Sequence, residues 1–168
     1  MINLEKLLKA KQSLASRDEN SPRRMRVRRD IEEFELENSR EATLRPLNDD
    51  EQYIFRVTLK GPQESLYAGH EFELRLEFPA HYPYGAPKLR FISPVFHPNI
   101  SSDGHISLNI LRSHWKPVMS LSVVIVGMLM LLSAPNPIEC INYEAAQLYI
   151  HDIEEYKKQV ELRMTREC

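Results

Sequence analysis

Cysteine is scarce in this chain, and its scarcity restricts both the fold and the compartment. The 168 residues contain only two cysteines, Cys140 and the terminal Cys168. Two cysteines give neither a disulfide framework nor the spacing of a zinc site, which favours a reducing compartment, here the cytoplasm and the nucleus. The composition is otherwise globular, with 42% hydrophobic and 27% charged residues, so disorder and collagen are excluded. We expect one soluble, monomeric domain.

Long hydrophobic runs and metal-binding motifs are also missing. The apolar stretch from Val118 to Leu132 is interrupted by Ser120, Ser122 and Gly127, and it falls short of the roughly 20 residues that span a bilayer. It therefore indicates a buried helix. The six histidines show no His-Glu-x-x-His spacing, and the cysteines show no Cys-x-x-Cys spacing. We expect no membrane association, no metal and no cofactor.

Charge is unevenly placed along the chain. Residues 1–29 contain nine basic and three acidic side chains, a net charge of +6, whereas the remainder contains 13 basic and 21 acidic side chains, a net charge of −8. Such an asymmetry favours a basic arm that binds an acidic partner. A solvated helix face with no partner is the alternative, because charge blocks often only solvate. We expect a protein partner and no nucleic acid.

The first twenty residues have the pattern of a basic amphipathic arm. Four leucines recur in it at intervals that suit one helix face: Leu4, Leu7, Leu8 and Leu14. The pattern is too short for a stable isolated helix, so we expect residues 1–20 to be flexible and to fold on a partner. Ser21 followed by Pro22 is typical of an N-cap with proline at the first helical position. The domain is therefore expected to span residues 21–168.

A helix is predicted after Pro22, because Val27, Ile31 and Phe34 lie on one face at helical spacing. Five arginines crowd its first turns, where positive charge opposes the helix dipole. They are Arg23, Arg24, Arg26, Arg28 and Arg29. Since this placement is mildly unfavourable to the helix, it favours a binding role for the arginines over a stabilising one.

Strand periodicity follows the helix. In residues 53–59 and 71–78 apolar side chains alternate with polar ones, so one face of each strand is buried and the other is wet. Residues 88–92 predict a shorter strand, and residues 42–47 predict a strand that opens the meander.

Helices are predicted to complete the chain. Residues 121–132 form the first, and a proline break at Pro135-Asn136-Pro137 is followed by a final helix with apolar positions at Ala145, Tyr149, Ile153, Tyr156 and Val160. A helix, a four-stranded antiparallel meander and C-terminal helices make an α+β domain.

Several short motifs occur in one order along the chain. They are Gly61-Pro62, Tyr67-Ala68-Gly69, Phe78-Pro79, Tyr82-Pro83-Tyr84, His97-Pro98-Asn99, Trp115-Lys116-Pro117 and Pro135-Asn136-Pro137. Over residues 23–168 the chain thereby resembles the ubiquitin-conjugating enzyme family. The resemblance implies the ubiquitin-conjugating fold, and a carrier that takes a ubiquitin-like modifier or ubiquitin from an activating enzyme to substrate lysines with a RING-type ligase. Ala86-Pro87 departs from the two prolines usual in the family, which should alter only a loop.

A second departure affects the chemistry. Eight residues after Asn99, where the family has the cysteine that carries the modifier as a thioester, this chain has Ser107. A thiol is partly ionised near neutral pH, whereas a serine hydroxyl needs an adjacent base to become nucleophilic. A serine ester is also less reactive toward amines than a thioester. We therefore expect Ser107 to load slowly and to discharge poorly.

A serine hydrolase is the other reading of Ser107. Asp103, His105 and Ser107 alternate along the loop, which is superficially suggestive. The Gly-x-Ser-x-Gly elbow is missing, however, since Ile106 precedes the serine and Gly104 lies three residues before it. We therefore expect no hydrolase activity.

The residues around Ser107 have structural and catalytic interpretations. Asn99 follows a proline and is of the kind that fixes a turn, while the resemblance implies that its amide also donates to the oxyanion formed when a lysine attacks. His97 and Pro98 are expected to be structural. Glu139 lies where the family usually has an aspartate that orients the incoming lysine, a role that rests on the resemblance.

Within the family the arm and the loop from Leu108 to Arg112 resemble the neddylation branch, whereas the segment from Gly61 to Gly69 resembles general ubiquitin carriers. The resemblance implies contacts with the activating enzyme or a ligase at Met1, Ile2, Leu4, Leu7, Leu8, Arg24, Arg28, Tyr84, Trp115 and Pro117. Trp115 has a second interpretation as a core anchor.

Two functions of different class therefore remain. The first is a conjugating enzyme with serine in place of its nucleophile, which is inactive or forms a stable ester. The second is a naturally inactive scaffold of the same fold that binds a modifier or a ligase. The retained His97-Pro98-Asn99 triplet, Glu139 and Trp115 favour the first.

Overall fold

The structure is a computed structural model that describes residues 21–47 and 53–164. Its helices and strands follow in this order: α2 (Pro22–Asn38), β1 (Ala42–Pro46), β2 (Ile54–Lys60), β3 (Glu71–Glu77), β4 (Lys88–Phe91), the 3₁₀ turn η1 (Asn109–Leu111), α3 (Leu121–Ser133), the 3₁₀ turn η2 (Pro137–Glu139), α4 (Tyr143–His151) and α5 (Ile153–Met164). The expected α+β order of helix, four strands and C-terminal helices is confirmed.

The four strands form one antiparallel meander in the order β1-β2-β3-β4. Period-two alternation places the apolar side chains of neighbouring strands opposite each other on one face, as where Val57 pairs with Leu74 and Leu59 with Phe72. These four side chains are at most 1% exposed. The strands predicted from the alternation of the sequence are therefore the strands observed.

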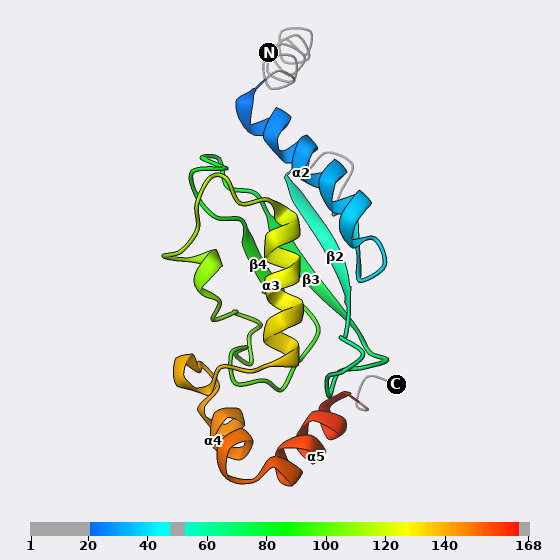
Figure 1. The fold of residues 1–168 in the computed structure, drawn as a ribbon, viewed down its shortest axis with the longest axis vertical. Helices are drawn as coiled ribbons and strands as arrows, with labels where there is room; N and C mark the ends of the chain where they lie inside the picture. The colour runs from blue at the N-terminus through cyan, green and yellow to red at the C-terminus, as the bar shows by residue number, and fades with distance from the viewer. Residues whose placement is uncertain (1–20, 48–52, 165–168) are drawn as a thin grey trace, which may run out of the picture.

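Helix α3 lies across the inner face of the sheet, while α4 and α5 gather at one end of the molecule (Figure 1). The apolar run forms this helix, whose side chains at Leu121, Val124, Ile125 and Met128 are fully buried. Its opposite side carries exposed apolar residues, including Met130. No helix within residues 21–47 and 53–164 has both the length and the apolar character needed to cross a membrane.

Helix α2 begins where the sequence predicts. The Ser21 side chain accepts a hydrogen bond from the Arg24 backbone N–H, and Pro22 occupies the first turn. Val27 and Phe34 are buried on the predicted face. The N-cap, the proline and the apolar spacing therefore agree on one start and one orientation for this helix.

Two of the arginines of α2 hold the fold together, contrary to the expectation that they serve binding. Arg26 donates to the backbone carbonyls of Pro117 and Met119 and pairs with Asp30. Arg23 donates to the Phe78 carbonyl, and its guanidinium lies 3.4 Å from the Tyr53 ring centroid. Apart from Asp30, which is four residues from Arg26, the partners in these contacts lie between 30 and 93 residues away, so the sequence pattern missed them.

The single final helix predicted from the apolar spacing is wrong. The chain forms two helices, α4 and α5, because Asp152 leaves the helical region with φ −147° and ψ 78°. Its side chain then accepts a hydrogen bond from the Glu155 backbone N–H at 3.0 Å and so caps α5. Tyr156 and Val160 are still buried, whereas Ile153 is 42% exposed.

Candidate active site

Ser107 lies in the long loop between β4 and α3. Ile100 pairs with Ile106 in an isolated antiparallel bridge, and both side chains are buried. Directly beside this bridge, the Ser107 backbone N–H donates to the Asn99 carbonyl at 2.8 Å. Ser107 is 7% exposed. The triplet and the serine, eight residues apart, are thus joined through the backbone.

His97 is fully buried behind this loop. Its Nδ1 accepts a hydrogen bond from the Asn99 backbone N–H at 2.9 Å, so its Nε2 carries the proton and donates to the Leu131 carbonyl at 2.9 Å. Burial lowers the pKa of His97 to about 4, against the opposing effect of the Leu131 carbonyl. The ring is therefore neutral near pH 7 and connects the loop to the end of α3.

Asn99 is fully buried, and its side chain is completely engaged. Its Nδ2 donates to the carbonyls of Asn136 at 2.7 Å and Glu139 at 3.1 Å, while its Oδ1 accepts from the Asn136 backbone N–H at 2.9 Å. These bonds connect the serine loop to the turn η2 and to Asn136, which caps it. Both amide hydrogens are used, so donation to an oxyanion at Ser107 requires one of these bonds to open.

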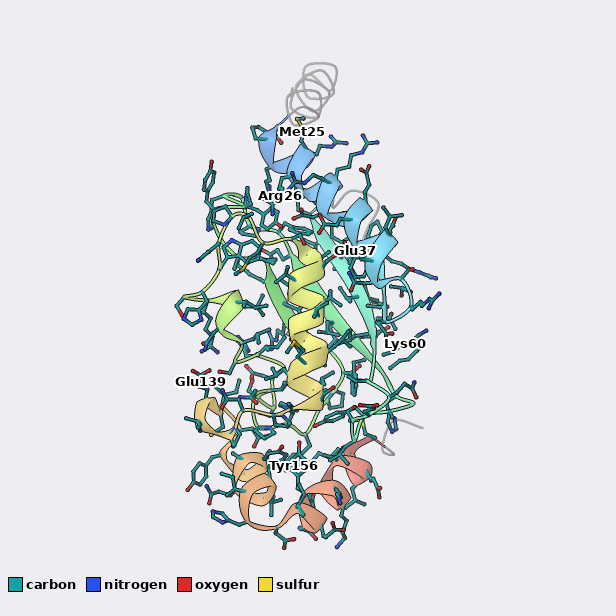
Figure 2. The ribbon with its side chains drawn as sticks, in the orientation of Figure 1. Met25, Arg26, Glu37, Lys60, Glu139 and Tyr156 are labelled. Atoms are coloured by element: carbon teal, nitrogen blue, oxygen red, sulfur yellow. The ribbon has the colours of Figure 1, made fainter. Side chains whose placement is uncertain are left out.

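Glu139 projects from η2 at the surface (Figure 2). Its two carboxylate oxygens accept from Asn109 Nδ2 at 3.1 and 2.9 Å. Asn109 begins η1, two residues after Ser107. The carboxylate is thereby held over the segment that follows the serine, although nothing in the spacing of 30 residues predicts this pairing.

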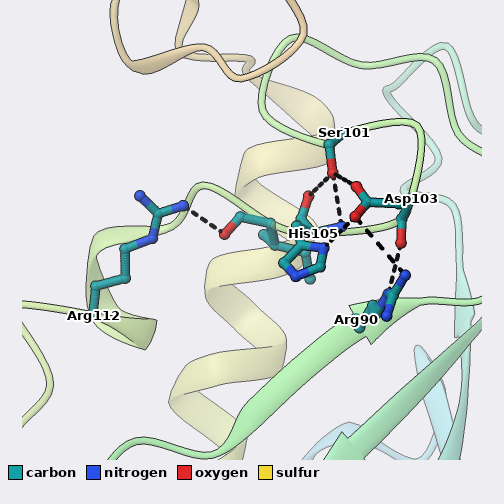
Figure 3. Close-up of polar contacts among 6 residues, drawn as sticks. Arg90, Ser101, Asp103, His105 and Arg112 are labelled. Carbon is teal, nitrogen blue, oxygen red and sulfur yellow. Dashed lines mark hydrogen bonds and ion pairs between the residues drawn. The ribbon is translucent and has the colours of Figure 1, made fainter.

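The Ser107 side chain has no hydrogen-bonded base anywhere in the described part of the chain. Figure 3 shows the polar side chains that follow Asn99 in the loop. His105 Nδ1 lies 3.0 Å from Asp103 Oδ2. The serine hydroxyl that donates to the same carboxylate, at 2.5 Å from Oδ1, belongs to Ser101 and not to Ser107. This hydrogen bond from Ser101 is the main cause that lowers the pKa of Asp103.

This cluster does not form a hydrolase triad. A triad requires the histidine between serine and carboxylate, whereas Ser101 and His105 both bind the same carboxylate. Arg90 adds a hydrogen bond from its Nε to the Asp103 carbonyl at 2.6 Å and ties the loop to β4 (Figure 3). The cluster therefore shapes a solvent-exposed turn.

The predicted ligase-contact residues gather on two adjoining loops. Trp115 Nε1 donates to the Pro83 carbonyl at 2.7 Å, and its ring contacts Tyr82 with centroids 5.9 Å apart. Tyr84, next to Pro83, is 81% exposed, and Pro117 is exposed as well. Trp115 is therefore both a partial core anchor and the link between the loops.

The predicted activating-enzyme contacts are only partly visible. Arg24 and Arg28 line one groove on α2, where Arg28 also pairs with Glu32 at 3.0 Å. The arm residues Met1, Ile2, Leu4, Leu7 and Leu8 lie outside the described residues, as does Cys168. Across residues 21–47 and 53–164, no three metal-ligating side chains come together.

Comparison with known proteins agrees with this geometry. A family model described as ubiquitin-conjugating enzyme matches residues 26–164. The chain is also similar to the protein named NEDD8-conjugating enzyme Ubc12 of Dictyostelium discoideum, with 35% identity over 154 residues. That match covers 91% of this chain and 66% of the relative, so the chain spans just under two thirds of its length. From the extent of the family match and this likeness, the chain belongs to the ubiquitin-conjugating enzyme family.

Proposed function

We propose that this protein is a carrier of a ubiquitin-like modifier in which Ser107 occupies the position of the modifier-bearing nucleophile. The observation that supports this role is the arrangement around the serine. Its backbone is bonded to Asn99, and Asn99 and Asn109 connect the two ends of its loop to η2, which carries Glu139. Hydrogen bonds thus connect the residues that precede and follow the serine to the turn that carries the carboxylate.

The chemistry of serine limits this carrier. Since no described side chain acts as a base toward Ser107, the hydroxyl is a weak nucleophile near neutral pH. Any modifier attached there forms an oxygen ester, which reacts more slowly with lysine than a thioester does. The protein therefore loads slowly, and the loaded form is inert or long-lived.

Neddylation is the branch we propose, with an activating enzyme, the modifier and a RING-type ligase as partners. It is supported by the likeness to a relative named a NEDD8-conjugating enzyme, and by the arm pattern of residues 1–20 and the loop from Leu108 to Arg112. A general ubiquitin carrier is the alternative within the family. Tyr84 and Pro117 are exposed on the loops proposed to meet the ligase.

A scaffold without transfer activity is the second candidate. Two observations favour it: Ser107 has no hydrogen-bonded base in the described chain, and both amide hydrogens of Asn99 are already used. A scaffold needs the fold and the exposed loops but not the nucleophile. It predicts binding of a modifier or a ligase without an adduct.

An adduct assay separates these candidates. With the neddylation activating enzyme, its modifier and ATP, the chain should form an adduct that resists thiol reductant and is cleaved by hydroxide, because an oxygen ester does not exchange with thiols. Ser107→Ala should abolish it. An adduct that reductant removes would instead identify Cys140 or Cys168 as the acceptor. No adduct with either the neddylation or the ubiquitin enzyme would favour the scaffold.

The Ser107→Cys variant tests the surrounding site. It should load rapidly and discharge to lysine, and Asn99→Ala in that background should slow discharge more than loading. Failure of Ser107→Cys to discharge, despite loading and an unchanged melting temperature, would contradict a functional carrier site.

A further inference from the structure

Arg112 lies shortly after the acceptor position, and its side chain reaches back toward it. Its backbone N–H donates to the Asn109 carbonyl at 3.0 Å and closes the turn η1. Its Nη2 donates to the Ile106 carbonyl at 3.1 Å, six residues back along the chain (Figure 3). This carbonyl belongs to the peptide unit that joins Ile106 to Ser107. Arg112 therefore binds the backbone directly before the acceptor.

Both polar groups of this peptide unit are held. Its carbonyl accepts from Arg112, and its N–H, which is that of Ser107, donates to the Asn99 carbonyl at 2.8 Å. A hydrogen bond from a charged donor is stronger than one from a neutral donor. Because a peptide unit is planar and its C=O and N–H point in opposite directions, the two bonds together fix its orientation. They also fix the direction in which the Ser107 side chain leaves the backbone.

The turn that carries Arg112 is placed by packing. Leu108 and Leu111 pack against the core. Ile110 lies close to α3 at Gly127, where an added Cβ would be 2.7 Å from Ile110 Cδ1. The position of the Arg112 backbone therefore does not depend on its own side chain, so a change of that side chain leaves the turn in place.

The charge of Arg112 is uncompensated within residues 21–47 and 53–164. None of the ion pairs there includes Arg112. Arg90 makes a similar hydrogen bond to the same loop, from its Nε to the Asp103 carbonyl at 2.6 Å. Its Nη2, however, lies 3.9 Å from the Asp103 carboxylate. The two arginines therefore both bind loop carbonyls, but only the charge of Arg90 has a described counter-ion.

Other ionisable groups of both signs surround the acceptor. Because they are unchanged when Arg112 alone is substituted, a comparison among variants of Arg112 isolates its own charge. These groups are Glu139 and Cys140 at the end of η2, Asp103 and His105 in the loop, the neutral His97 behind it, and His114 after η1.

We propose that Arg112 is a positioning residue for the acceptor at position 107, which it serves by holding the preceding peptide and by placing positive charge near the atom that becomes negative. The inference rests on the proposed function, because that atom becomes negative only if position 107 takes up an acyl group. In that step the nucleophile loses its proton to solvent and bonds to the acyl carbon. The former carrier of the acyl group leaves with the electrons of the broken bond. A nearby positive charge stabilises the anionic nucleophile.

Distance sets the size of this effect. The hydrogen bond and the covalent bond lengths limit Arg112 Nη2 to about 7 Å from the Ser107 Cα. At about 7 Å, with a permittivity between that of water and that of a protein surface, one unit charge changes a pKa by roughly 0.4 to 1.7. Because Arg112 is exposed, we expect a change near the lower end, about 0.5. The thiol of the Ser107→Cys variant reports this change, since its thiolate is the reactive form.

Alkylation by iodoacetamide at a series of pH values tests the proposal in the full chain. The parent protein carries Ser107→Cys with Cys140→Ala and Cys168→Ala, so one thiol remains, and the mass of the intact protein gives the rate. Arg112→Gln should raise the pKa of this thiol by about 0.5 and slow alkylation about two- to threefold below that pKa. Arg112→Lys keeps the charge and should retain the parent pKa. Arg90→Gln is the matched control and should also leave it unchanged.

Added salt provides a further measurement. The difference in thiol pKa between the parent and Arg112→Gln should shrink as the ionic strength rises, because exposed charges are screened. A difference that does not respond to salt, or no difference at all, would overturn the electrostatic role of Arg112. Melting temperatures of all variants, which should agree with that of the parent, show that the fold is retained.

Two other results would also overturn the proposal. A rise of the thiol pKa in Arg112→Lys as large as that in Arg112→Gln would assign the effect to lost hydrogen bonding and not to charge. An equal rise in Arg90→Gln would assign it to the surface charge in general. These measurements need neither an activating enzyme nor a modifier. A parent protein that fails to load with them counts against the proposed carrier, whereas the thiol pKa values decide the role of Arg112.

Discussion

Two Arg–carboxylate pairs on α2 allow a direct measurement of what burial contributes. Arg26 pairs with Asp30 at 2.8 Å and Arg28 with Glu32 at 3.0 Å, both four residues apart. The Asp30 side chain is fully buried and also accepts from the Tyr82 hydroxyl. Both side chains of the second pair are more than half exposed. The sequence spacing and the helix are the same, so the pairs differ in their environment and in the carboxylate, which is an aspartate in one and a glutamate in the other.

The predicted losses of unfolding free energy on neutralising the two carboxylates differ several-fold. Removing one charge from a buried pair costs about 3–5 kcal/mol, because the remaining charge is left without compensation. Asp30→Asn keeps the volume and one acceptor, so we expect a loss near the lower end, about 3 kcal/mol. Glu32→Gln should change the unfolding free energy by less than about 0.5 kcal/mol.

Urea denaturation measures both variants, with equal m-values required for the comparison. At about 2–4 °C per kcal/mol for a chain of this size, Asp30→Asn should also lower Tm by roughly 6–12 °C. Tyr82→Phe alone and combined with Asp30→Asn completes a double-mutant cycle in which the two losses should not add. If Asp30→Asn costs no more than Glu32→Gln, the network does not stabilise the fold in the way argued.

Two further predictions concern pH and backbone. The pKa of His97 falls from an ordinary 6.5 to about 4 in the fold, so between these values the unfolded chain binds more protons and the folded state loses stability as the pH falls. Urea titrations should show the unfolding free energy decreasing by about 1.4 kcal/mol per pH unit below pH 6.5. The same slope in His97→Gln would refute this assignment. Gly104 has φ +85°, and an added Cβ would lie 2.0 Å from the Phe91 carbonyl oxygen. Gly69 has a similar φ of +81°, but an added Cβ there would meet open space. Gly104→Ala should therefore lower Tm more than Gly69→Ala, and equal losses would rule out the steric contribution.

The sheet and the start of α2 were predictable because their signals are local. Alternation in residues 71–78 identifies the buried face of β3, and Ser21 with Pro22 identifies the N-cap. Asp152 shows the limit of such reasoning. The apolar spacing continues across it to Tyr156, so periodicity alone predicts one helix where the backbone breaks.

The site was predictable only where family motifs occur. The triplet and Ser107 were found from their order, but the bonds that organise them join residues far apart. Asn99 meets Asn136 across 37 residues, and Asn109 meets Glu139 across 30. Such contacts follow from how loops pack at the end of α3, and neither composition nor periodicity carries that information.

The support of Ser107 does not depend on its side chain. Hydrogen bonds run from the Leu131 carbonyl through His97 to the Asn99 backbone, and from the Asn99 carbonyl to the Ser107 N–H. Each of these hydrogen bonds is made by a backbone group or by the His97 ring, and none by the Ser107 hydroxyl. Exchange of the hydroxyl for a thiol therefore leaves the scaffold intact, so a restored activity in Ser107→Cys reports chemistry and not refolding. Because the loop does not depend on the Ser107 side chain, the fold also remains intact in a protein that only binds partners and has a weak nucleophile.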